Sequence, residues 1–126
     1  MKKIIDINTL KNKIAKIKKN RKKIILCHGV FDLLHIGHIK HLKIAKNLGD
    51  ILIVSLTTDK FVNKGPGRPI FNEKLRCEAI ESLGFVDYVT LSNSPSAVEI
   101  INKIKPNIYC KGNEYEDKSK DVTKKI

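Results

Sequence analysis

The sequence predicts an α/β protein, a single domain built on a Rossmann-like, doubly wound parallel sheet. Short apolar runs rich in β-branched residues alternate with segments whose apolar residues recur every three or four positions. This alternation is typical of a parallel sheet that carries helices on both faces. The length of 126 residues fits one domain, and a content of 41% hydrophobic and 30% charged residues is that of a globular chain.

Each element is predicted from its local pattern. Apolar runs predict four buried strands, over residues 24–27, 51–56, 86–91 and 107–111. Helical spacing predicts an N-terminal helix that ends near Asn20, with an apolar face formed by Ile7, Leu10, Ile14 and Ile17. A second helix is marked by Ile39, Leu42 and Ala45. Residues 57–59 are expected to cap a short helix that runs to Val62. The last fifteen residues are polar, and we expect them to be irregular.

Capping residues predict where the other helices begin and end. Gly49 follows the last periodic residue of the second helix and is expected to be its C-terminal cap. Asn72 is an N-cap for a helix over residues 73–83. Ser94 and Pro95 have the pattern of an N-cap followed by proline at the first helical position, which predicts a helix to Ile104.

The formal charge of +12 is concentrated at the N-terminus. Residues 1–23 contain nine lysines, Arg21 and a single acid, Asp6, and we treat this stretch as a basic N-terminal helix preceding the domain over residues 24–126. A run of lysines on the polar faces of a helix is usually solvated. Binding to nucleic acid through this arm stays an open alternative but is not the favoured one, and no membrane partner is expected.

Cysteine usage and hydropathy favour a cytoplasmic protein. The three cysteines, Cys27, Cys77 and Cys110, form no CxxC pair, so a disulfide framework or a zinc site is not expected, and we interpret all three as small core residues. No apolar run approaches the roughly 18 residues that span a bilayer, and no signal peptide pattern opens the chain.

The loop after the first strand carries the residues typical of a phosphate site. Parallel sheets bind ligands beyond the carboxyl ends of their strands, so we expect this loop and the loop after the fourth strand to share one crevice, with those two strands as neighbours. Gly37 would let a phosphate approach the N-terminus of the second helix, while His35 and His38 add donors. Phe31 is expected to fill the core beneath the loop, and Asp32 to orient a histidine or accept from backbone N–H groups. His28 and His41 are interpreted as structural.

Residues 29–38, GVFDLLHIGH, resemble the GxFDxxHxGH signature of the cytidylyltransferase-like nucleotidyltransferases. Within that family the chain looks most like the adenylyltransferase domain of ADP-heptose synthases, and next like glycerol-3-phosphate cytidylyltransferases. The resemblance covers about residues 8–120. It implies transfer of a nucleotidyl group to a phosphate monoester, with Mg²⁺ held mainly by the substrate phosphates and no metal site formed by the protein. It also implies a homodimer.

The resemblance assigns roles to residues by their place in the family's motifs. The catalytic group comprises His35, His38, Lys64 of the basic KGxGRP loop, and Arg76 at the end of the NEKLR segment. The nucleotide-binding group comprises Gly29, Val30, Phe31, Gly37, Lys111, Gly112 and Glu114, the last standing where the family usually has aspartate. Substrate contacts are expected from Asp32 and Lys46.

The function expected from these residues is activation of a sugar phosphate of the heptose-1-phosphate type by ATP, with release of pyrophosphate. A CTP-dependent enzyme acting on glycerol-3-phosphate or another polyol phosphate is the first alternative. A non-catalytic module that binds nucleotide or nucleic acid is the second. The chain stops before the Ser/Thr-rich segment that closes the family's site, so we expect it to bind nucleotide but to turn over poorly.

Overall fold

The computed structural model describes residues 2–62, 65, 67–111 and 123–125. Its strands are β1 (Ile24–Gly29), β2 (Ile51–Thr57), β3 (Tyr88–Ser92), β4 (Ile108–Lys111) and β5 (Thr123–Lys125). Its helices are α1 (Ile7–Lys19), α2 (Ile36–Lys46), the 3₁₀ turn η1 (Asp59–Phe61), α3 (Glu73–Glu81) and α4 (Val98–Ile104). The predicted alternation of strands and helices is confirmed.

The strands form one sheet in the order β3-β2-β1-β4-β5. The first four are parallel, and β1 lies between β2 and β4, which confirms the predicted pairing of the first and fourth strands. The strand order reverses at β1, so the carboxyl ends of β1 and β4 form the crevice in which such sheets bind ligands.

The fifth strand corrects, at residues 123–125, the expectation that the last fifteen residues are irregular, and the other twelve lie outside the described part of the chain. Residues Thr123–Lys125 pair antiparallel with β4, and Lys125 stands opposite Ile108. A strand of this length has too few positions to show an alternating pattern, and it owes its conformation to the backbone ladder that β4 offers. The prediction failed because the stabilising partner is remote in sequence.

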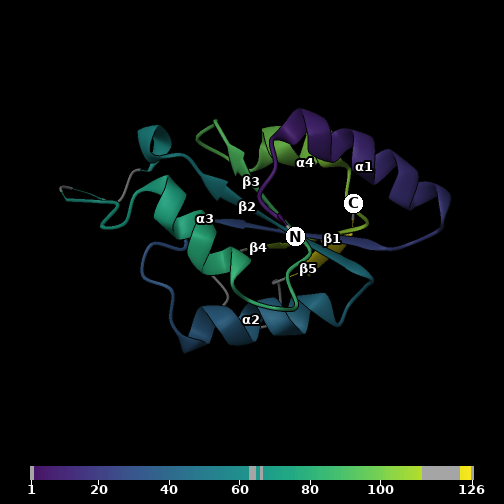
Figure 1. Cartoon of the computed structure of the whole chain (residues 1–126), viewed down its shortest axis with the longest axis horizontal. Coiled ribbons are helices and arrows are strands. Elements are labelled where there is room, and N and C mark those ends of the chain that lie inside the picture. The colour runs from purple at the N-terminus through teal and green to yellow at the C-terminus, as the bar shows by residue number, and fades with distance from the viewer. Residues whose placement is uncertain (1, 63–64, 66, 112–122, 126) are drawn as a thin grey trace.

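Helices cover both faces of the sheet, as predicted. Figure 1 shows α1 and α4 on one side of the strands and α2 and α3 on the other. On the first side Leu10 and Ile14 of α1 are buried against β1, β2 and α4, and Ile7 and Ile17 pack at the margin of this core. The apolar face predicted for the N-terminal helix is therefore confirmed. On the second side the core includes Leu42 and Ala45 of α2 and Cys77 of α3.

The three cysteines of the chain are buried and form no disulfide, as expected for small core residues.

Three helix boundaries differ from the predictions, and one of them is the end of α3, which lies at Glu81 and not at residue 83. Helix α4 begins at Val98 with Ala97 as its N-cap, so Ser94 and Pro95 lie in the preceding loop. Helix α2 ends at Lys46 with Asn47 as its C-cap. Gly49 is instead required for close packing, because a Cβ at this position would lie 2.5 Å from Cδ1 of Ile25. The predicted N-cap of α3 is confirmed, since the Asn72 side chain accepts from Leu75 N–H at 2.9 Å.

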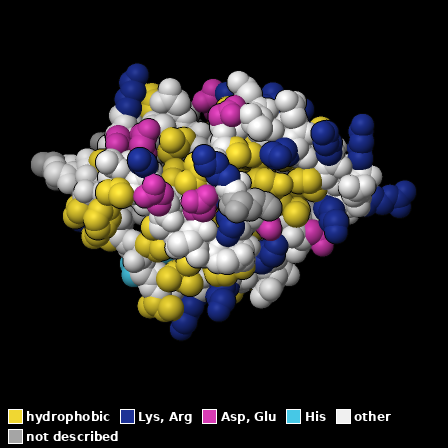
Figure 2. Space-filling view, viewed as in Figure 1, with side chains coloured by type: hydrophobic (Ala, Val, Ile, Leu, Met, Phe, Trp, Pro, Cys, Tyr) yellow, Lys and Arg dark blue, Asp and Glu magenta, His cyan; other side chains and the backbone are white. Residues whose placement is uncertain are grey.

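The surface bears the charge that the sequence predicts. Lysine and arginine side chains stand out along α1, and hydrophobic side chains gather near the start of α3 (Figure 2). The lysines of α1 are exposed, in agreement with a solvated helix face. No helix within the described part of the chain is long and apolar enough to cross a membrane.

Candidate active site

An open cleft of about 360 Å³ lies beyond the carboxyl end of β1, beside the N-terminus of α2. Most of its lining comes from the loop that joins these two elements, and one residue comes from the loop after η1. The lining residues are Val30, Phe31, Asp32, Leu33, His35, His38 and Arg68. The structure thus brings five of the predicted site residues together at the predicted edge of the sheet.

Phe31 shapes the floor of this cleft. The side chain is 2% exposed and belongs to the core under α2 and α3, which confirms its predicted place. Its backbone has a φ of 50°, which turns the chain sharply out of β1. Gly29 makes this turn possible, because a Cβ there would lie 3.0 Å from the Phe31 ring. The same ring meets His38 edge to face, with 5.5 Å between centroids.

His35 and His38 form a reciprocal cap on the first turn of α2. Nδ1 of His35 accepts the N–H of Gly37 at 3.0 Å, and Nδ1 of His38 accepts the N–H of His35 at 3.2 Å. Because each Nδ1 is an acceptor, each Nε2 carries the ring hydrogen in this arrangement. The rings lie 4.1 Å apart between centroids. The pair therefore places two imidazole rings in the lining of the cleft beside a helix N-terminus, an arrangement suited to an anion.

His28, at the end of β1, is part of the buried scaffold, as predicted. Its Nδ1 lies 2.7 Å from Ser55 Oγ, and its Nε2 lies 3.3 Å from Thr57 Oγ1. Burial lowers the pKa of His28 to about 4, so the ring is neutral at physiological pH. Its bonds to two residues of β2 hold the carboxyl ends of these strands together.

His41, on α2, is also buried, and burial lowers its pKa while a hydrogen bond to the Lys111 backbone acts in the opposite direction. That bond connects α2 to the end of β4.

Asp32 holds the segment after the basic loop against the signature loop. Its carboxylate accepts the N–H groups of Ile70 at 2.8 Å and of Phe71 at 2.9 Å, and it pairs with Arg68 Nη1 at 3.2 Å. Of the two roles considered for Asp32, acceptance from backbone N–H groups is confirmed. A direct contact to substrate stays a prediction.

The sequence model of the family described as cytidylyltransferase-like matches residues 26–125 of this chain. The chain belongs to the cytidylyltransferase-like family. The family predicted from the GxFDxxHxGH signature is thereby confirmed, and the cleft described above is formed by that signature. The match includes β2, β3, β4 and β5 in full and β1 from Leu26 onward, and it leaves out α1.

Several curated relatives in this family carry the name Bifunctional protein HldE. The chain is 40% identical over 113 residues to the relative from Campylobacter concisus, which covers 86% of this chain and 24% of that protein. It is 39% identical over 115 residues to the one from Citrifermentans bemidjiense, which covers 90% and 24%. The chain therefore spans about a quarter of the length of the curated relatives it matches.

A solved structure supports the same assignment. The lipopolysaccharide core biosynthesis protein from Thermoplasma volcanium matches with a TM-score of 0.65 and 35% identity. The match covers 71% of this chain and 73% of that protein. The family fold is therefore supported by sequence and by structure.

Apart from Lys46, which is described below, the other predicted residues of the cytidylyltransferase-like site divide into three groups. Gly29, Gly37 and Lys111 lie at the carboxyl edge of the sheet, with Lys111 exposed at the end of β4 and in register with His28. Arg76 lies behind the cleft, buried at 1% exposure among protein oxygens. The remaining three residues lie outside the described part of the chain, and their roles stay predictions: Lys64, Gly112 and Glu114.

The structure places Lys46 away from the cleft, which disagrees with its predicted contact to substrate. It is the last residue of α2, ten positions after the helix begins, which at about 1.5 Å per residue puts it roughly 15 Å from the capped end. Its Nζ pairs with Asp87 at 2.7 Å and donates to the carbonyl of Asp50 at 2.8 Å. Both partners precede a strand, at the amino edge of the sheet, so Lys46 stabilises the edge opposite to the cleft.

Arg68 was not among the predicted site residues, yet it lines the cleft with the two histidines. The pattern of the KGxGRP segment had indicated a loop with one functional lysine. The signal that could have identified this arginine is the pair of glycines before it. Gly65 and Gly67 have φ angles of 95° and 79°, and the Arg68 N–H donates to the Gly65 carbonyl at 3.3 Å. This turn is glycine-dependent, and it directs the chain back toward Asp32.

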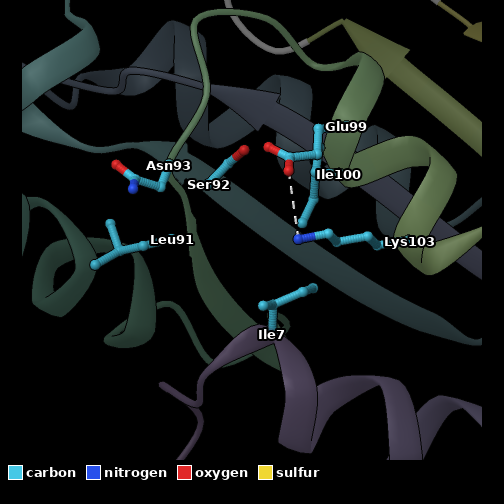
Figure 3. A pocket seen from close by; sticks show the side chains of 7 residues that line it. All are labelled: Ile7, Leu91, Ser92, Asn93, Glu99, Ile100 and Lys103. Carbon is cyan, nitrogen blue, oxygen red and sulfur yellow. Dashed lines mark ion pairs between the residues drawn. The ribbon is translucent and has the colours of Figure 1, made fainter.

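A second cavity, of about 230 Å³, lies between α1, α4 and the end of β3. Figure 3 shows Glu99 and Lys103 of α4 forming an ion pair above Ile7, with Ser92 and Asn93 opposite. It contains none of the signature residues, and its ion pair is an exposed contact between successive turns of one helix, which contributes little binding energy. We therefore place the candidate active site in the first cleft.

Proposed function

We propose that the protein is a nucleotidyltransferase that joins a sugar phosphate of the heptose-1-phosphate type to ATP and releases pyrophosphate. The observation that carries this proposal is the reciprocally capped pair of His35 and His38 lining a cleft at the N-terminus of α2. Two imidazole rings whose orientation is fixed by backbone hydrogen bonds are suited to oxygens that gain charge during the reaction.

The proposed step is an in-line displacement at phosphorus. An oxygen of the acceptor phosphate forms a bond to the α-phosphorus, the bond from that phosphorus to the bridging oxygen breaks, and pyrophosphate leaves with the electron pair. The acceptor oxygen is already ionised near neutral pH, so no residue has to remove a proton. The site has to hold the two substrates in line and to stabilise charge on the departing group.

Mg²⁺ is proposed to be held by the substrate phosphates. Asp32 is the one carboxylate among the residues that line the cleft, and its oxygens already accept three N–H groups. Within the described residues no group of three or more histidine, cysteine or acidic side chains is arranged to hold a metal ion. When bound, the ion would neutralise charge on the triphosphate.

The choice of sugar phosphate and ATP rests on the relatives. The name of the lipopolysaccharide core biosynthesis protein supports a sugar-related acceptor, and the signature resembles the adenylyltransferase domain of ADP-heptose synthases. The CTP-dependent alternative, with glycerol-3-phosphate or another polyol phosphate, uses the same cleft and the same step. The second alternative is a non-catalytic module that binds nucleotide or nucleic acid, and the exposed lysines of α1 favour nucleic acid within that alternative.

A screen for pyrophosphate release tests the proposal. Purified protein is incubated with Mg²⁺, with ATP or CTP, and with heptose-1-phosphate, another sugar-1-phosphate or glycerol-3-phosphate. We expect release to require both substrates and to be greatest with ATP and the heptose phosphate. Lys43→Gln, an exposed position on the same helix as His38, is the control that should keep full turnover. Release only with CTP and glycerol-3-phosphate would select the first alternative, and salt-sensitive RNA binding without any release would select the second.

A further inference from the structure

Arg76 is bonded on all sides by protein oxygens. Its Nε donates to the carbonyl of Phe71 at 3.0 Å, and its Nη1 donates to the carbonyls of Val30 and Thr57, each at 2.9 Å. Its Nη2 pairs with the Asp59 carboxylate at 2.6 Å. These acceptors belong to the signature loop, the end of β2, η1 and the segment before α3. Arg76 therefore connects four segments around the cleft and is not among the residues that line it.

Arg68 has the opposite environment. Its side chain is 38% exposed, lines the cleft beside both histidines, and donates from Nη1 to Asp32. A planar guanidinium with several N–H donors suits bidentate contact to a phosphate. The turn from Gly65 to Arg68, with its two positive φ angles, fixes the backbone from which this side chain extends.

Asp32 holds Arg68 without depending on it. Partial burial raises the pKa of Asp32, but hydrogen bonds from the N–H groups of Phe71 and Ile70 and from Arg68 outweigh burial and lower it overall. If Arg68 turned toward a phosphate, the two backbone donors would still satisfy the carboxylate. The ion pair thus keeps the guanidinium close to the cleft at little cost when it moves to a ligand.

We propose that Arg68 is the arginine that binds a substrate phosphate in the cleft lined by the histidines, and that Arg76 is a positioning residue that builds the cleft without touching the substrate. This division of roles rests on the proposed function for the identity of the ligand as a phosphate or pyrophosphate group. The phosphate-binding role that the sequence resemblance assigned to Arg76 is thereby given to Arg68.

The chain contains three arginines, Arg21, Arg68 and Arg76, which allows one substitution to be compared at three sites. Arg21→Gln is the control, because this exposed residue follows α1 and lies outside the cleft. Inorganic pyrophosphate is the probe, and its binding is measured by calorimetry at two salt concentrations beside the thermal midpoint of each variant. Binding is tested apart from turnover, so the proposal can survive even if the screen for pyrophosphate release fails.

We expect Arg68→Gln to weaken pyrophosphate binding about 10- to 100-fold, the loss typical of a charge-assisted hydrogen bond, with an unchanged thermal midpoint. Arg68→Lys should restore part of the affinity. Arg76→Gln should instead lower the thermal midpoint by several degrees. If Arg68→Gln binds pyrophosphate as well as Arg21→Gln does, the assignment of Arg68 is wrong.

The positioning role of Arg76 needs a readout that loss of stability alone would not change. Arg76→Lys keeps the charge but cannot reach four acceptors, and it is measured well below its thermal midpoint. We expect its pyrophosphate affinity to stay within about threefold of the wild type, while the ring signals of His35 and His38 shift in nuclear magnetic resonance spectra. A fully folded Arg76→Lys that loses affinity as Arg68→Gln does would show that Arg76 binds phosphate directly, and unchanged histidine signals would refute the positioning role.

Discussion

His28 is expected to make the folded protein less stable as the pH falls from 7 to 4. Burial lowers the pKa of His28 from 6.5 to about 4 in the folded state, so the unfolded chain binds a proton more readily. Stability conferred by the neutral ring is therefore full above pH 6.5 and is lost progressively down to the folded pKa. With about 1.36 kcal/mol for each pKa unit, the whole loss is about 3 kcal/mol, of which about 2 kcal/mol falls between pH 7 and pH 5.

Urea unfolding at pH 7 and pH 5 measures this loss directly. His28→Asn is the variant of choice, because an amide can still bond to the Ser55 hydroxyl but does not titrate. It should be less stable than the wild type at pH 7, yet its free energy of unfolding should fall by about 2 kcal/mol less between the two pH values. His41, whose pKa is also lowered by burial, titrates in both proteins and cancels in the comparison. Equal losses in the two proteins would refute the assignment of a buried neutral imidazole to His28.

Three further predictions concern the site, the packing and the basic arm. His38→Ala should lower kcat by about 10²–10³ while nucleotide affinity changes much less, in single-turnover kinetics beside calorimetry, and near-normal turnover would show that His38 does not stabilise the transition state. Gly49→Ala should lower the free energy of unfolding by about 1–3 kcal/mol, because its Cβ would lie 2.5 Å from an Ile25 carbon, whereas Gly84→Ala meets no atom within 4 Å and should change it little. Glutamine at three exposed lysines of α1, namely Lys16, Lys18 and Lys19, should leave turnover nearly unchanged. A large loss of turnover would show that the basic arm takes part in the chemistry.

The sequence predicted the features that depend on local chemistry. The period of Ile7, Leu10, Ile14 and Ile17 identified the buried face of α1, since an apolar stripe has to meet a core wherever that core lies. The Asn72 cap joins residues three positions apart, so it too could be predicted from the local sequence. The adjacency of β1 and β4 followed from the rule that ligands bind where strand order reverses.

The sequence could not predict where side chains and segments remote from the signature lie relative to the cleft. Lys46 is eight residues from His38 in the chain, yet a helix carries it to the other edge of the sheet. Arg76 and Arg68 are both arginines near the basic loop, and only the fold shows which one is turned inward to the carbonyls of Val30 and Thr57. The strand β5 likewise depends on its distant partner β4.

The capping role of the histidines complicates any alanine substitution at them, because the ring of His35 stabilises α2 as well as facing the cleft. Loss of an N-cap costs about 1 kcal/mol, so His35→Ala should lower both stability and turnover. Asparagine is a good N-cap, and its side-chain oxygen can accept the Gly37 N–H in place of Nδ1, but it has no donor at the position of Nε2. His35→Asn should therefore recover most of the stability lost in His35→Ala, as measured by urea unfolding, while turnover stays low. If asparagine restored turnover together with stability, the ring of His35 would act on the helix alone, and the transition state would be stabilised by other donors of the cleft.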